Sequence, residues 1–314
     1  MWALNDLRTL LSSRSIYPLM ELLRGKPVSD MIENTVREMV CQEKAVLSVF
    51  LTGSDPSSLL YARSKERKGR KLGIEVRINQ FPQSVDEEKL LESIAAEASE
   101  DEVRGIMIER PVPPGLNLEK MMEEIPPEKD VEGLHPFNLG RLLGGNPYFI
   151  PPTPLGAVLL LRHYAIETEG KKALVIGRSM NVGRPISVLL SQKKPWGNST
   201  VTLAHSRTKD LGAIALDSDI IVSAVGRAGY ITGEMVKDGA TIIDMGINPL
   251  PDGSIVGDAD IRSLEDREVR VTPTPGGTGP VTVSSMFLNM ALSCSRDNKR
   301  SFSGIDPMIT EIYR

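Results

Sequence analysis

The chain has 314 residues, of which 40% are hydrophobic and 25% charged, and its formal net charge is −4. This length is typical of two domains, and an acidic balance without a basic block argues against nucleic acid as a partner. No apolar run is long enough to cross a membrane, and the three histidines and two cysteines lack the spacing of a metal site. Two distant cysteines are typical of small buried residues in a reducing compartment, so we expect a cytoplasmic protein.

The first half of the chain alternates between helical patterns and apolar runs. Residues 1–23 are rich in Leu and Ser and predict an added amphipathic helix, with a transit peptide as the alternative. Beyond them, we expect helices at 27–40, 57–72, 86–99 and 117–124, and strands at 45–51, 75–81 and 105–108. This alternation predicts a parallel sheet covered by helices.

Residues 126–154 are rich in Pro, Gly and Asn, which indicates a domain boundary. A linking helix is expected at 154–164. The second half then predicts a Rossmann-like order of elements, with strands at 173–176, 200–204, 220–223, 241–244 and 269–271 and a last helix at 281–293. We therefore expect an α/β protein in which two domains flank a cleft: an N-terminal α/β domain (1–150), a Rossmann-like nucleotide-binding domain (151–290), and a C-terminal segment (291–314) that returns toward the first domain.

The stretch 173–185 reads as a strand, a turn that contains Gly177 and Gly183, and the start of a helix. N–H groups at a helix start favour an anion, and glycine lets the backbone approach a phosphate. Because the full G-x-G-x-x-G pattern is absent, the stretch is equally compatible with an ordinary strand-to-helix turn.

The segment after the second strand of this domain carries Ser206 and Arg207 where an NAD site would place an acid. Arg178 and Ser179 lie on the first turn. Hydroxyl and basic side chains suit a 2′-phosphate, so this pattern favours NADP over NAD.

Tyr61 and Lys65 are four residues apart in a predicted helix and therefore share one face. A phenol beside an amine can transfer protons or bind a carbonyl. Several charged residues surround them, so spacing alone favours a solvated helix face.

Three further stretches are candidates for a site, each with a plain structural alternative. Residues 109–111 end a predicted strand, where ligands of α/β sheets bind, or form a proline turn with a surface ion pair. The acids of 129–133 can bind a basic heterocycle, or belong to a polar loop. Residues 275–280 allow close approach of a flat ligand, or form a flexible linker.

Taken together, these stretches resemble the bifunctional methylenetetrahydrofolate dehydrogenase/cyclohydrolase family from about Gly25 to the last predicted helix. Five motifs carry the resemblance and occur in the family's order: 53–65 resembles its substrate helix, 129–136 its Lys-Asp-Val-Asp-Gly-Phe-His-Pro signature, 177–185 its Gly-Arg-Ser-x-x-Val-Gly-x-Pro turn, 205–208 its His-Ser-x-Thr, and 273–282 its Pro-x-Pro-Gly-Gly-Val-Gly-Pro-x-Thr loop.

The resemblance implies NADP-dependent oxidation of 5,10-methylenetetrahydrofolate to the methenyl form, and hydrolysis of that form to 10-formyltetrahydrofolate, in one-carbon metabolism. It implies a homodimer that uses no metal, nucleic acid or membrane. Lys65 would be the essential lysine of the hydrolysis, Tyr61 would position the folate, and Glu132 would hold the pterin. Tyr61, Glu109 and Glu132 are counted as catalytic together with Lys65. The other implied residues are Ile108, Glu109, Arg110, Pro275, Gly276, Gly277 and Thr282 for the folate, and Gly177, Arg178, Ser179, Ser206 and Ile247 for NADP.

The chain departs from the family pattern at three places. The family usually has Val-Gln-Leu-Pro-Leu-Pro where this chain has Ile-Glu-Arg-Pro-Val-Pro at 108–113, Asp at the position of Glu132, and Pro-Cys-Thr-Pro at 151–154. A carboxylate at Glu109 within about 4–6 Å of Lys65 is expected to raise the lysine pKa, unless Arg110 neutralises it. Two alternatives therefore stay open: a dehydrogenase with weak or absent cyclohydrolase activity, and a folate- or nucleotide-binding protein without turnover.

Overall fold

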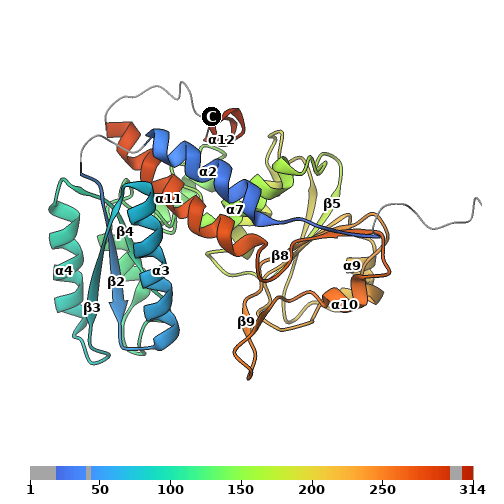
Figure 1. Cartoon of the computed structure of the whole chain (residues 1–314), viewed down its shortest axis with the longest axis horizontal. Helices are drawn as coiled ribbons and strands as arrows, with labels where there is room; N and C mark the ends of the chain where they lie inside the picture. Colours follow the sequence, from blue (N-terminus) through green and yellow to red (C-terminus); the bar gives the residue numbers. More distant parts are fainter. Residues whose placement is uncertain (1–18, 40–43, 298–305, 314) are drawn as a thin grey trace, which may run out of the picture.

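The computed structural model describes residues 19–39, 44–297 and 306–313, and these form two α/β lobes joined by long helices (Figure 1). The N-terminal lobe is built on a three-stranded parallel sheet in the order β3-β2-β4. Its elements are β2 (Val46–Thr52), α3 (Pro56–Leu72), β3 (Glu75–Phe81), α4 (Glu87–Ser99), β4 (Val103–Ile108) and α5 (Leu118–Glu124). The predicted parallel, helix-covered sheet is confirmed.

Local chemistry explains where the helices of this lobe begin and end. The Asp55 side chain accepts a hydrogen bond from the Ser58 N–H at 2.8 Å, which caps α3. The helix ends at Gly73, which has a left-handed φ of 78° that favours glycine. Asp86 and Asn117 cap α4 and α5 in the same way as Asp55 caps α3.

The C-terminal lobe contains a six-stranded parallel sheet in the order β1-β11-β8-β7-β5-β6. Its elements are β1 (Met20–Leu22), β5 (Lys172–Ile176), α8 (Gly183–Ser191), β6 (Thr200–Ala204), α9 (Leu211–Leu216), β7 (Ile220–Ser223), η1 (Gly233–Met235), β8 (Thr241–Asp244), α10 (Ile261–Leu264) and β11 (Val269–Val271). The chain reverses its direction of winding at β5, between β6 and β7. In doubly wound sheets, ligands bind at such a switch point.

The first strand of this sheet corrects an expectation. Met20–Leu22 pairs in parallel with β11 instead of ending the helix expected over residues 1–23, of which 1–18 lie outside the described residues. The pairing partner lies about 250 residues away in the sequence, so local periodicity gives no sign of it. The chain therefore contributes a strand to the C-terminal sheet before it enters the N-terminal lobe.

Three helices form the junction between the lobes: α2 (Gly25–Met39), α7 (Pro152–His163) and α11 (Thr278–Asp297). Buried side chains of these helices, such as Val28, Leu155 and Phe287, belong to one apolar core with Leu47 of β2 and Val175 of β5. This shared core fixes the lobes against each other, because moving either would expose apolar surface.

The segment 126–154, which shows little periodicity and indicates a domain boundary, contains a short helix that the sequence analysis did not predict, α6 (Pro136–Leu143). His135 caps the N-terminus of this helix, because its Nδ1 atom accepts a hydrogen bond from the Phe137 N–H at 3.0 Å. Eight residues that include Gly140 are too few to show helical periodicity. A small hairpin is formed by β9 (Asn248–Pro249) and β10 (Ile255–Val256).

At the C-terminus, α12 (Pro307–Tyr313) packs against the central helices. Ile309 and Ile312 are buried, and Glu311 forms an ion pair with Arg162 of α7. Among the described helices, none combines the length and apolar character that a membrane-spanning segment needs. Cys294 is buried and belongs to no disulfide among the described residues, and Cys41 lies outside them.

Candidate active site

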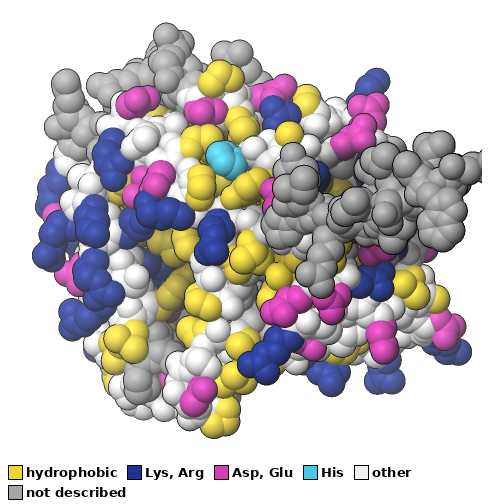
Figure 2. Space-filling model, turned by 45° about the vertical axis from the view of Figure 1, so that its right-hand side comes forward, with side chains coloured by type: hydrophobic (Ala, Val, Ile, Leu, Met, Phe, Trp, Pro, Cys, Tyr) yellow, Lys and Arg dark blue, Asp and Glu magenta, His cyan; other side chains and the backbone are white. Residues whose placement is uncertain are grey.

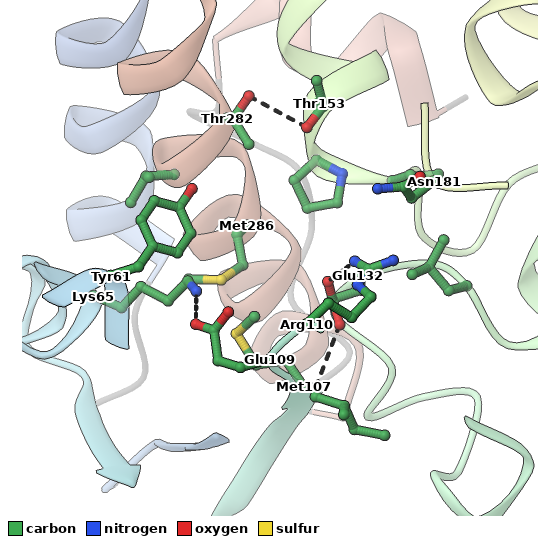
Figure 3. Close-up of a pocket in the computed structure, with 15 residues that line it drawn as sticks. Tyr61, Lys65, Met107, Glu109, Arg110, Glu132, Thr153, Asn181, Thr282 and Met286 are labelled. Atoms are coloured by element: carbon green, nitrogen blue, oxygen red, sulfur yellow. Dashed lines mark hydrogen bonds and ion pairs between the residues drawn. The ribbon is translucent and has the colours of Figure 1, made fainter. Parts of the chain in front are cut away.

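A cleft lies where the carboxyl end of β4 faces the start of α7, the middle of α11 and the turn after β5 (Figure 3). The structure brings seven of the expected site residues together in its wall: Tyr61, Lys65, Ile108, Glu109, Arg110, Glu132 and Thr282. Both lobes contribute to the wall, because Asn181 belongs to the turn that follows β5. The cleft therefore has the position expected of a site shared by two ligands.

Helix α3 presents two different faces. Its outer face carries exposed cations at Arg63, Arg67 and Arg70. Figure 2 shows that Lys and Arg side chains gather at the left of the molecule in that view. The inner face carries Lys65, which is only 2% exposed, and its Nζ lies 4.0 Å from the centroid of the Tyr61 ring. The prediction of a solvated helix face is therefore confirmed for the three arginines and is wrong for Lys65.

Lys65 and Glu109 form a direct ion pair within the cleft wall, and both side chains are buried. Burial lowers the pKa of the Lys65 ammonium, and the attraction of Glu109 only partly opposes this effect. Burial likewise raises the pKa of the Glu109 carboxyl. The predicted proximity is confirmed, but the predicted net increase of the Lys65 pKa is wrong, because desolvation outweighs the charge of the partner.

Arg110 makes its ion pair with Glu132, so that its charge acts on Glu109 only as a minor influence. Side chains alternate at the end of β4, and Arg110 Nη2 instead donates to Glu132 Oε1 at 2.8 Å. The other Glu132 oxygen, Oε2, accepts a long hydrogen bond of 3.4 Å from the Ile108 N–H. The cleft therefore contains two separate ion pairs, one on each side, as Figure 3 shows.

The Tyr61 hydroxyl remains protonated at neutral pH. Burial raises its pKa to about 12, and the negative charges of Glu109 and Glu132 add to the increase. Tyr61 can therefore donate a hydrogen bond or offer its ring to a ligand, but it is not a base.

The loop that carries Glu132 is held by Asp130, which is fully buried. Asp130 Oδ2 accepts hydrogen bonds from the His135 N–H and from Asn138 Nδ2, each at 2.8 Å. Burial raises the pKa of the Asp130 carboxyl to about 6. Asp130 and Asn138 thus support the loop that carries Glu132, a structural role that the sequence analysis did not predict.

Several other lining residues were also missed. Thr153 lies beside Thr282, with their Oγ1 atoms 3.5 Å apart, and Met286 lies one helical turn beyond Thr282. Thr282 and Met286 are four residues apart on the last predicted helix and therefore share one face, so the sequence could have indicated Met286 as a neighbour of Thr282. Asn181 lies between Gly177 and Gly183, in the turn that the sequence had indicated as a cofactor site, so its position in that turn was the signal that could have identified it.

The turn after β5 depends on its glycines. Gly177 has a φ of +117°, and an added Cβ would lie 2.5 Å from the Ala224 carbonyl oxygen on the loop after β7. A Cβ on Gly183 would lie 1.9 Å from the Gly177 carbonyl oxygen. Arg178, Ser179 and Ser206 are exposed around this turn. Its position at the switch point of the sheet distinguishes it from an ordinary strand-to-helix turn.

One buried carboxylate organises the neighbouring loops. Asp258 accepts hydrogen bonds from the N–H groups of Val225 and Arg227 at 2.7 and 2.9 Å and from Asn248 Nδ2 at 3.0 Å. It therefore joins the loop after β7 to the loop after β8, on which Ile247 is 58% exposed. No pattern in the sequence distinguished Asp258 from surface aspartates.

Pro275, Gly276 and Gly277 do not line the cleft. The loop packs closely against the start of α2 instead: the Gly25 N–H donates to the Gly276 carbonyl at 2.8 Å, and a Cβ on Gly25 would lie 1.9 Å from the Gly277 carbonyl oxygen. In the described part of the chain, no group of three or more His, Cys, Asp or Glu side chains is arranged to hold a metal ion.

Comparison with known families agrees with this geometry. Residues 23–132 match the model of the tetrahydrofolate dehydrogenase/cyclohydrolase catalytic domain, and residues 151–298 match the model of the NAD(P)-binding domain of the same enzymes. The chain belongs to the tetrahydrofolate dehydrogenase/cyclohydrolase family. The boundary between the two matches falls in the segment that precedes α7.

Members of this family are similar over most of their length. The bifunctional protein FolD of Methanosphaerula palustris is 43% identical over 270 residues, which cover 85% of this chain and 95% of the relative. A crystal structure of the bifunctional enzyme FolD from Campylobacter jejuni is 35% identical, with a TM-score of 0.84, and the match covers 88% of this chain and 99% of that chain. The Trypanosoma brucei enzyme, solved with NADP cofactor and inhibitor, has a TM-score of 0.83 at 31% identity over 89% of this chain and 98% of that chain.

Proposed function

We propose that this family member oxidises 5,10-methylenetetrahydrofolate to 5,10-methenyltetrahydrofolate with NADP⁺, and hydrolyses the product to 10-formyltetrahydrofolate. The observation that carries the proposal is the position of Lys65. Its amine is buried against the Tyr61 ring in a cleft whose wall also includes Asn181 of the cofactor turn. A proton-handling group thus lies where a folate and a dinucleotide would meet.

The cofactor turn fits a phosphorylated dinucleotide. Its glycines leave no room for side chains, and exposed hydroxyl and basic groups, Ser179, Ser206 and Arg178, surround it. Arg207 lies beyond β6, where an acid would select the free 2′-hydroxyl of NAD. We therefore assign Gly177, Arg178, Ser179, Ser206 and Ile247 to NADP. When bound, NADP⁺ supplies the hydride acceptor.

The oxidation removes a hydride from the one-carbon bridge of the folate and leaves a methenyl cation. The contribution of the chain to this step is orientation. We infer that Tyr61 offers its ring and hydroxyl to the folate and that Glu132 binds the pterin. We place Ile108, Arg110 and Thr282, which line the cleft, in the folate site.

The hydrolysis adds water to the methenyl carbon, opens the ring and releases one proton. Lys65 is the group placed to accept that proton, and its burial lowers its pKa and so favours the neutral amine. Glu109 contacts the same amine and favours its charged form. Lys65 and Glu109 are therefore the residues that set the rate of this step.

We also propose that the enzyme is a cytoplasmic homodimer. Cys294 is a buried cysteine that belongs to no disulfide among the described residues, which is compatible with a reducing compartment. Strand β6 is one of the two edge strands of the six-stranded sheet and exposes Leu203, which is suitable for pairing with a second copy. Sedimentation of the purified protein tests the oligomeric state, and a monomer at micromolar concentration would argue against the dimer.

Two absorbance assays test the function. With methylenetetrahydrofolate and NADP⁺, the purified enzyme should form NADPH, and NAD⁺ should be a poorer acceptor. With methenyltetrahydrofolate alone, its absorbance should disappear faster than in buffer. Formation of no reduced cofactor with either nucleotide would overturn the dehydrogenase assignment. Oxidation without accelerated hydrolysis would restrict the assignment to the first step.

A further inference from the structure

Arg110 and Glu132 together form a donor–acceptor edge in the cleft wall, opposite Tyr61 and Lys65 (Figure 3). Glu132 is almost fully buried, whereas the Arg110 side chain retains 34% of its surface exposed. In the described part of the chain, the Arg110 guanidinium makes one hydrogen bond, from Nη2 to Glu132 Oε1. A guanidinium has five N–H donors, so most of them stay available to a ligand.

This edge differs from the family pattern. Where the resembling motif has an aliphatic leucine, this chain has an arginine, and a leucine has no donor to offer. The pairing also occupies one oxygen of Glu132, the acid that the proposed function assigns to the pterin. A ligand that binds here therefore meets a carboxylate acceptor directly beside cationic N–H donors.

A cyclic amide presents the complementary pattern, because its ring N–H donates and its adjacent carbonyl accepts. The pterin ring of a tetrahydrofolate carries such an edge at N3 and C4. We propose that Arg110 is a specificity-determining residue that donates to the pterin C4 carbonyl while Glu132 accepts from the neighbouring ring N–H. This inference rests on the proposed function and concerns how the substrate is selected.

The arrangement discriminates against ligands that lack the carbonyl. If an amino group replaces it, donors face donors, and those N–H groups of the guanidinium that point to the ligand, away from Glu132, are left without an acceptor. Sites built to hydrogen-bond a polar group reject analogues without it strongly, because buried groups then stay unpaired. An aliphatic residue at position 110 imposes no such cost.

The test compares the affinity of tetrahydrofolate with that of its 4-amino counterpart, in which an amino group replaces the C4 carbonyl. We expect the wild-type enzyme to bind the 4-oxo compound at least tenfold more tightly. Arg110→Leu should reduce this preference at least fivefold, mainly through weaker binding of the 4-oxo compound. Arg110→Lys keeps a positive charge beside Glu132 but lacks the planar guanidinium. Its preference for the 4-oxo compound should therefore lie between those of the wild type and of Arg110→Leu.

Arg63→Leu, which removes an exposed arginine from the outer face of α3, is the matched control and should leave the preference unchanged. NADP binding to each variant reports whether the C-terminal lobe is intact. A preference that Arg110→Leu leaves unchanged, or equal losses for both compounds, would overturn the inference. The function is tested separately: a wild-type enzyme that fails to oxidise methylenetetrahydrofolate contradicts the proposed function, whereas an active enzyme with an unaltered preference contradicts only the role of Arg110.

Discussion

The Lys65 ammonium contacts the Glu109 carboxylate inside the cleft, and less than a tenth of either side chain is exposed to solvent. The family motif has a neutral glutamine at the position of Glu109. The same lysine is therefore subject to two opposing influences: burial, which favours the neutral amine, and an adjacent carboxylate, which favours the ammonium.

Glu109→Gln should raise cyclohydrolase activity relative to dehydrogenase activity, by roughly tenfold. Removing the carboxylate lowers the Lys65 pKa further, so that more of the lysine is neutral near pH 7 and able to accept the proton from water. The acidic limb of the hydrolysis pH profile should move to lower pH. Glu97→Gln, which disrupts the ion pair between the buried Glu97 of α4 and Arg77 of β3, is the control. An unchanged ratio of the two activities would show that Glu109 does not govern Lys65.

Lys65→Met should abolish most hydrolysis, with a loss of about 10²-fold or more, and should affect oxidation less. It should also destabilise the fold by about 3–5 kcal/mol, because the Glu109 charge is then buried without a partner. Urea unfolding measures this loss. The double variant Lys65→Met/Glu109→Gln should recover most of the stability but not the hydrolysis. Equal stabilities of the single and double variants would contradict the ion-pair account.

Asp130 should make the protein less stable as pH rises from about 4 to about 6. Its pKa is raised from 3.8 to about 6 in the folded protein, so the unfolded chain releases this proton first. The stabilising contribution is complete below pH 4 and is lost as the carboxyl ionises in the native state, at a cost of about 3 kcal/mol. Asp130→Asn should remove this part of the pH dependence in urea unfolding. Asp266→Asn, at an exposed position, should leave it in place, and parallel profiles for wild type and Asp130→Asn would refute the prediction.

Gly183→Ala should weaken NADP binding by at least tenfold, because the new Cβ meets the Gly177 carbonyl oxygen and must displace the cofactor turn. Gly212→Ala is the matched control: no atom lies within 4 Å of its Cβ position, and alanine favours a helix more than glycine does by about 1 kcal/mol. Titration with NADP measures the affinity of each variant, and thermal unfolding shows whether each variant is folded. Normal NADP affinity in Gly183→Ala would show that the turn does not form the cofactor site.

The sequence alone determined the succession of elements in both lobes and the residues that approach the cleft from α3 and β4. Hydrophobic periodicity and capping residues are local, so Asp55, Gly73 and the apolar run of β5 predict their elements without knowledge of the rest of the chain. Motif order was enough to indicate the family and its ligands.

Only the tertiary structure decided how the charges of the site pair. Glu109 and Arg110 are neighbours in the sequence, yet they turn to partners on different segments, Lys65 and Glu132. The strand Met20–Leu22 and the buried Asp258 likewise take their roles from distant contacts. Solvation decides the pKa of Lys65, and burial depends on which helices and loops close over a side chain. Folding brings these helices and loops together from positions far apart in the sequence, so no local pattern can predict the contacts between them.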